Sequence, residues 1–310
     1  MPVQASLEAV LATHELVLME AAVSELLVHS FGIPTHPQLG CAPCIYHQAG
    51  RRALKRIYGG FLALARESGV PLLITAPTWR ANKSVVQAVD CPQAINQDAV
   101  RFMQGVRHDL GQEMTQPVLI GGLLGPLRDA YRPDLAVDEK SARQEHSWQA
   151  EALAQAGADY LMAATLPAVE EAAGLAQAMA QTGLPFMVSF VIDKQGRILD
   201  GSSLDRAIQE IDAHCSSPPS GYMINCSYPS FLRPEKEPAR VLSRLIGYQA
   251  NASSLEHSAL DNSGVLQADA VEDWGEGMLT LHRHWGLKIL GGCCGTGDEH
   301  LRYLVQNRTA

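Results

Sequence analysis

The hydrophobic positions of this chain fall into short apolar runs, separated by longer segments in which apolar residues recur at helical intervals. Several runs are apolar at successive positions, as expected of parallel strands that are buried on both faces. The runs predict eight strands, at residues 16–20, 71–77, 117–123, 159–165, 185–191, 221–227, 247–253 and 287–293.

Helices are predicted between these strands. The clearest are residues 51–69, 141–158, 168–183 and 203–215. Gly69 is suited to end the first of them in a left-handed conformation, and Ser203 is suited to cap the start of the last. Strands that alternate with helices in this way predict an α/β fold, a single (β/α)8 barrel domain over residues 1–310. A doubly wound open sheet is the alternative.

Composition narrows the functional class. Of 310 residues, 46% are hydrophobic and 18% are charged, so the chain can bury a large core. A formal net charge of −9 argues against nucleic acid or an anionic membrane as a partner. The longest apolar runs are strand-sized, and the N-terminus lacks the basic start of a secretory signal. We therefore expect a cytoplasmic protein, with a homo-oligomer left open.

The cysteines carry the clearest chemical signal. In a (β/α)8 barrel the carboxyl ends of the strands face the active side. Cys226 lies at the end of the sixth predicted strand, and Cys293 and Cys294 lie at the end of the eighth. In a reducing compartment such thiols are more often ligands or nucleophiles than disulfides. Three cysteines on one face predict a catalytic zinc site, which keeps a fourth position open.

A zinc site of this kind suits thiol chemistry. A thiol bound at the open position loses its proton, and its sulfur can then attack a methyl group carried by a cationic donor. Two alternatives remain for the cysteine pair. They could be buried thiols in a glycine turn, or the loop could bind phosphate before a helix that starts at Gly297 and Asp298.

Two motifs resemble a known family. The segments "NCS" (225–227) and "GGCCGT" (291–296) are similar to the paired signature of the homocysteine S-methyltransferase family. Segments 73–82, 121–134, 151–172 and 251–253 also resemble that family. The resemblance implies a (β/α)8 barrel that holds zinc through Cys226, Cys293 and Cys294. It also implies methyl transfer from a donor such as S-methylmethionine, betaine or a methylated folate to a small thiol, with homocysteine expected first.

The acceptor end departs from the family pattern. The family usually has an aspartate and a glycine where this chain has Glu20 and Ala21. The fourth strand of the family tends to end in Glu-Thr, and its glutamate helps to hold the amino-acid end of homocysteine. This chain has Ala164 and Thr165 there, which predicts a weaker hold on an ammonium group. Two other functions stay open: methyl transfer to a different sulfur or selenium compound, and a non-catalytic relative that only binds zinc or thiols.

Further candidates follow from residue type and place. The expected substrate-binding residues are Glu20, Thr165, Asn225 and Asn251. Aromatic candidates for holding a cationic donor are Trp79, Tyr131, Tyr228 and Trp274. Cys41 and Cys44 form a C-x-x-C, which is either a redox or metal motif or a pair of incidental loop thiols. Structural roles are expected for Cys91 and Cys215, and solvated or core positions for His36, His47, His282 and His284.

Overall fold

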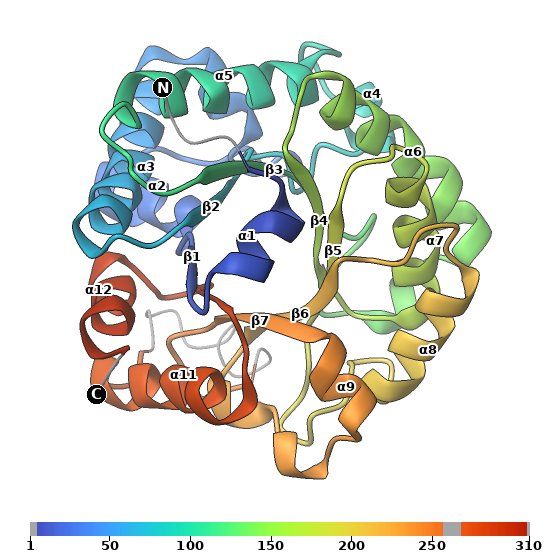
Figure 1. Ribbon diagram of the computed structural model, residues 1–310. Helices are drawn as coiled ribbons and strands as arrows, with labels where there is room; N and C mark the ends of the chain where they lie inside the picture. Colours follow the sequence, from blue (N-terminus) through green and yellow to red (C-terminus); the bar gives the residue numbers. More distant parts are fainter. Residues whose placement is uncertain (1–4, 257–267, 309–310) are drawn as a thin grey trace.

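The computed structural model describes residues 5–256 and 268–308, and its strands form a closed barrel (Figure 1). The strands are β1 (Val17–Met19), β2 (Leu72–Thr75), β3 (Val118–Leu124), β4 (Tyr160–Leu166), β5 (Phe186–Phe190), β6 (Gly221–Ser227), β7 (Leu245–Ala250) and β8 (Ile289–Gly292). Each pairs in parallel with its neighbours in chain order, and β8 also pairs with β1. The predicted (β/α)8 barrel is therefore confirmed, and the open sheet is excluded.

Helices surround this barrel (Figure 1). They are α1 (Leu7–Thr13), α2 (Val23–Phe31), α3 (Gln48–Ser68), α4 (Lys83–Ala88), α5 (Ile95–Leu110), α6 (Glu139–Gln155), α7 (Val169–Ala180), α8 (Leu204–His214), α9 (Ala239–Arg244), α11 (Val271–Trp285) and α12 (Asp298–Asn307). The loops also contain the short 3-10 helices η1 (Ala42–Tyr46), η2 (Pro133–Leu135), η3 (Pro229–Phe231) and η4 (Pro234–Lys236). Among the described residues, no helix is long and apolar enough to cross a membrane.

The predicted element ends agree with the structure within a few residues. Gly69 follows α3 with a φ of 66°, and the Ser203 side chain accepts a hydrogen bond from the Arg206 amide at the start of α8. The largest difference in a strand is at β7, which begins two residues earlier than predicted and ends at Ala250. Asn251 consequently lies just beyond the strand end rather than within it.

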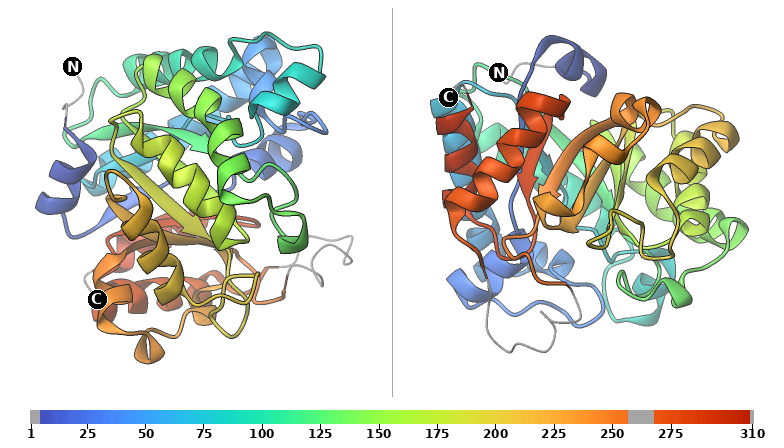
Figure 2. Two further views of the ribbon diagram at one scale, coloured as in Figure 1. Left: turned by 90° about the vertical axis from the view of Figure 1, so that its right-hand side faces the viewer. Right: turned by 90° about the horizontal axis from the view of Figure 1, so that it is seen from below.

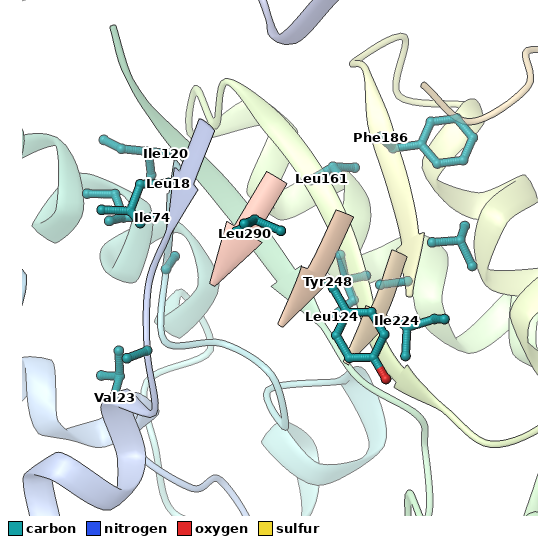
Figure 3. Close-up of a cluster of buried hydrophobic side chains, with 14 of the residues drawn as sticks. Leu18, Val23, Ile74, Ile120, Leu124, Leu161, Phe186, Ile224, Tyr248 and Leu290 are labelled. Carbon is teal, nitrogen blue, oxygen red and sulfur yellow. The ribbon is translucent and has the colours of Figure 1, made fainter. Parts of the chain in front are cut away.

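Alternate residues of each strand face two different cores. In β1, Val17 and Met19 point into the barrel, whereas Leu18 joins the layer between the strands and the helices. Figure 3 shows part of that outer layer. The inner core is closed at the amino ends of the strands by α1, whose Leu7 and Val10 pack into it (Figure 2, right). The carboxyl ends of the strands therefore form the side of the barrel that is left for a functional site.

Candidate active site

Three cysteines meet at the carboxyl ends of β6 and β8. Cys226 is the penultimate residue of β6, and Cys293 and Cys294 directly follow β8. Their Sγ atoms all lie within 4.8 Å of one another, and this is the one group of metal-ligating side chains found in the described part of the chain. Cys226 is buried, and the other two are half-buried. The convergence predicted from sequence is confirmed.

Two of these cysteines lie within bonding reach of each other. The Cα atoms of Cys226 and Cys293 are 5.4 Å apart, inside the range of about 4.4 to 6.8 Å that a disulfide spans, so oxidation can join them. This pairing was not expected from the sequence. A metal binds thiolates rather than disulfide sulfurs, so the form that can bind a metal through all three cysteines is the reduced one.

The donor set fits a soft, tetrahedral metal ion. Zinc binds cysteine sulfur at about 2.3 Å, and the three cysteines, with Cys226 and Cys293 both reduced, would be near enough to one another to hold one ion. Three sulfur ligands also leave the open fourth position that is typical of a catalytic zinc site.

The phosphate-binding alternative does not fit the loop after β8. Its backbone amides already have partners: Gly295 donates to Glu25 Oε2 at 2.6 Å, and Thr296 donates to the Cys293 carbonyl at 3.1 Å. The Gly297 amide donates to His300 Nδ1 at 3.2 Å. A phosphate cradle needs such amides free to face the anion.

Asn225 joins the ends of three neighbouring strands around Cys226. Its Oδ1 accepts from the Thr165 amide at 2.8 Å and from Ser189 Oγ at 2.7 Å. Its Nδ2 donates to Thr165 Oγ1 at 2.6 Å and to Cys226 Sγ at 3.3 Å. Asn225 and Thr165 thus position Cys226 and place a hydrogen-bond donor on its sulfur, which favours the thiolate. Substrate contact by these two residues stays a prediction.

The backbone at this point is strained. Thr165 has a φ of 64° and Cys226 a φ of 53°, and among the described non-glycine residues only these two have positive φ. Such values cost about 1–3 kcal/mol each in residues with a Cβ and persist where the surroundings enforce them. Here the Asn225 hydrogen bonds supply that constraint, and they tie the backbone of β4 to that of β6.

Asn251 approaches the same cysteine from β7. Its Nδ2 donates to the Cys226 carbonyl at 3.1 Å. Its Oδ1 is buried and has no hydrogen-bond partner among the described residues. Asn251 therefore has a buried acceptor atom that a substrate donor can use. Its contact with substrate stays a prediction.

Glu20 lies after β1 and turns toward β2. Its Oε2 accepts from the Thr75 amide at 2.7 Å and its Oε1 from Thr75 Oγ1 at 2.5 Å. Burial raises the pKa of Glu20 to about 7, although both hydrogen bonds from Thr75 oppose the shift. This carboxyl group is consequently bound within the protein and poorly suited to neutralise a substrate ammonium.

Glu25 was not predicted from the sequence, although its carboxylate contacts the loop that carries Cys294. It accepts the Gly295 amide and also forms a hydrogen bond with the Cys294 side chain. Burial, followed by the charge of Glu25, raises the pKa of Cys294 to about 12, while a hydrogen bond from Tyr131 lowers it. The signal was present, because Glu25 is the acid of the "SEL" triplet after Glu20.

The aromatic candidates separate into two groups. Trp79 lies at the rim, where its Nε1 donates to the Ala164 carbonyl at 3.0 Å, and Tyr131 lies beside Cys294. Trp274 is fully buried in α11 with its ring edge-on to His300, so the expectation that it holds a donor is wrong. Tyr228 is also buried, and its carbonyl accepts from the hydroxyl of Tyr248.

Cys41 and Cys44 are separate buried thiols at the start of η1 rather than a disulfide. Burial raises the pKa of Cys41 to about 11, and that of Cys44 is raised by the same cause. Redox cysteines have lowered values, so these features favour a structural role. Two of the histidines make local contacts. His36 Nδ1 accepts hydrogen bonds from two backbone amides of a turn, and His282 Nδ1 lies within hydrogen-bond distance of the Leu287 carbonyl.

Comparison with known proteins agrees with this site. The sequence profile described as homocysteine S-methyltransferase matches residues 17–307, which include all eight strands and all three cysteines. This chain belongs to the homocysteine S-methyltransferase family. The membership implied by the two cysteine motifs is thereby confirmed.

Individual relatives of this family member are distant. It is 25% identical over 180 residues to homocysteine S-methyltransferase YbgG of Bacillus subtilis (strain 168), covering 56% of this chain and 55% of that protein. The matched region thus spans about half the length of that curated relative. Among solved structures, it resembles the metallated form of the homocysteine methyltransferase MmuM from Escherichia coli, with a TM-score of 0.73 at 18% identity. That match covers 96% of this chain and 98% of MmuM. The oxidised form of MmuM matches with a TM-score of 0.70 at 20% identity, covering 97% and 99%.

Proposed function

We propose that this protein is a zinc-dependent S-methyltransferase that transfers a methyl group from a cationic donor to a small thiol, with homocysteine as the acceptor to test first. The observation that carries the proposal is the meeting of Cys226, Cys293 and Cys294 at the carboxyl ends of β6 and β8, in a chain of this family. Cysteine sulfur is the ligand type that zinc selects, and three such ligands leave room for one substrate atom.

The chain's own residues have distinct parts in this proposal. The three cysteines would hold zinc, which when bound lowers the pKa of a thiol ligand and keeps its sulfur nucleophilic at neutral pH. Asn225 orients Cys226 through the hydrogen bond to its sulfur, and Glu25 fixes the loop that carries Cys294. Trp79 lies at the rim with its ring beneath the Arg80 guanidinium and fixes the end of β4 through the hydrogen bond to the Ala164 carbonyl.

The transfer balances without a protein acid. A new bond forms between the acceptor sulfur and the methyl carbon, and the bond from that carbon to the donor heteroatom breaks. The electron pair of the broken bond stays on the donor, which leaves as a neutral molecule. The acceptor thiol gives up its proton on binding, so no side chain has to protonate a leaving group.

The test is a metal assay coupled to turnover. Reduced protein is expected to carry about one zinc per chain and to methylate at least one thiol in a panel of thiols and of cationic sulfonium and betaine donors. Cys91→Ser serves as a control, because Cys91 is not part of the three-cysteine cluster and its sulfur donates to the Val86 carbonyl. Stoichiometric zinc without turnover of any pair would replace the proposal with a zinc- and thiol-binding role.

A further inference from the structure

A cation follows β2 beside Trp79 at the rim of the barrel. Arg80 follows β2, and its guanidinium Cζ is 4.9 Å from the centre of the Trp79 ring. Trp79 is in turn fixed to the end of β4, where its Nε1 donates to the Ala164 carbonyl at 3.0 Å. The next residue is Thr165, whose Oγ1 is 3.7 Å from Cys226 Sγ. One aromatic ring and one residue therefore connect Arg80 to the cysteine site.

The charge of Arg80 is not neutralised within the part of the chain that the structure describes. Several arginines of this protein pair with a carboxylate, for example Arg107 with Asp159 and Arg244 with Asp212. Arg80 is half-buried, and its one recorded contact is the stacking on Trp79. A guanidinium over an aromatic ring keeps its N–H groups available as donors, and these can bind a carboxylate in two parallel hydrogen bonds.

The carboxylates at this site are already engaged. Glu20 accepts two hydrogen bonds from Thr75, and Glu25 binds the Gly295 amide and Cys294. The end of β4 provides only the methyl group of Ala164, which belongs to the apolar core of the barrel interior with Trp79 packed against it. Among the described residues, the site therefore offers a cation without a carboxylate partner for an acidic group, and both Glu20 and Glu25 are engaged within the protein.

We propose that Arg80 binds the carboxylate of the acceptor, and that the acceptor is a thiol acid whose recognition needs no α-amino group. This inference rests on the proposed methyltransferase function and names the acceptor class of that same site. The simplest acceptor of this class is 4-mercaptobutanoate, which is homocysteine without its amino group.

The experiment compares two thiols that differ only in charge, 4-mercaptobutanoate and 4-mercaptobutan-1-ol, in the wild-type protein and in Arg80→Met. A hydrogen-bonded charge pair of this kind changes kcat/KM by about 10- to 100-fold. We expect Arg80→Met to lose that factor for the acid and to leave the alcohol unchanged, with Arg80→Lys in between. Zinc content, equal in all three proteins, shows that the site is intact.

Arg128→Gln is the matched control, because Arg128 is an exposed arginine on the loop after β3 and its removal changes net charge by the same amount. It is expected to lower the preference for the acid by less than about twofold. Calorimetric affinities of the zinc-loaded protein for both thiols, measured without donor, give the same ratio independently of turnover. An acid preference that survives Arg80→Met in these affinities would overturn the role of Arg80. Absence of turnover with the preference intact would overturn the proposed function alone.

Discussion

The two halves of the site differ in how far they keep the family pattern. On the side of β6 and β8, every residue that the family resemblance implies is present, and the structure brings the three sulfurs together. On the side of β1 and β4, Glu20 is turned to Thr75, and Ala164 stands where the family has a glutamate. On the two proposals made above, the sulfur side sets the type of reaction, and the other side sets which acceptor is held.

Removal of a sulfur ligand should have the largest effect. Cys294→Ser is expected to lose most of the bound metal and to lower turnover about 1,000-fold or more, because a catalytic metal supplies several kcal/mol of barrier lowering. Elemental analysis and steady-state kinetics measure the two effects. Cys91→Ser should behave as the wild type. Equal metal content in Cys294→Ser and wild-type protein would remove Cys294 from the ligand set.

Oxidation should abolish the metal site without a mutation. With the bond between Cys226 and Cys293 formed, five of the seven cysteines are free. Oxidised protein should bind no zinc at this site while folded, and should titrate five thiols after unfolding. Reduced protein should bind about one ion while folded, and should titrate seven thiols after unfolding. Full zinc binding by protein that titrates five thiols would contradict the assignment of Cys226 and Cys293.

On the acceptor side, restoring an acid should shift specificity. Ala164→Glu is expected to raise the ratio of kcat/KM for homocysteine over 4-mercaptobutanoate about 10-fold, through a charged hydrogen bond to the amino group. Ala164→Gln is the control, because it adds the same bulk beside Trp79 without the charge. If both variants change the ratio equally, steric effects rather than charge set the preference.

The raised pKa of Glu20 should make the stability of the protein depend on pH. Its pKa is about 7 in the folded protein, against 4.5 for an unperturbed glutamate. Between those values the unfolded chain releases a proton that the folded protein keeps, so the free energy of unfolding falls as pH rises and levels off above about 7. The Glu20→Gln variant lacks this fall in the free energy of unfolding, because glutamine does not ionise. Its stability relative to wild type should rise by on the order of 3 kcal/mol from pH 4.5 to 8.

Urea denaturation at several pH values measures that difference. Parallel pH curves for Glu20→Gln and wild type would mean that Glu20 is ionised in the folded protein, and it would then be available to hold an ammonium group.

The sequence was sufficient for the fold and for the convergence of the three cysteines. Buried parallel strands are recognisable in a sequence as apolar runs. The two cysteine motifs lie at the ends of such runs, and a barrel brings the carboxyl ends of its strands to one face. Side-chain directions cannot be read from the spacing of residues. They determine the pairing of Cys226 with Cys293, the hydrogen bonds of Glu20 to Thr75 and the role of Glu25. Arg80 is similar: its neighbour Trp79 was noted, but stacking and the absence of a carboxylate partner appear only in three dimensions.

Trp274 shows the opposite error. Its residue type suited a cationic donor, yet the spacing of buried residues in α11 places it in the core beside His300. The helix itself was not among those predicted, so the apolar face that buries Trp274 was not recognised. Residue type alone is therefore a weak guide to a binding site unless the element that carries the residue is known.

The central claim is that zinc bound by three cysteines receives the acceptor sulfur as its fourth ligand. X-ray absorption at the zinc edge tests it directly, because sulfur and lighter ligands differ in bond length, with zinc–sulfur bonds at about 2.3 Å and zinc–oxygen or zinc–nitrogen bonds at about 2.0–2.2 Å. Reduced, zinc-loaded protein should show three sulfur ligands and one lighter ligand, and addition of the acceptor thiol should convert the set to four sulfurs. Fewer than three sulfurs before addition, or no gain of sulfur at a saturating concentration of a thiol that the protein methylates, would contradict the account.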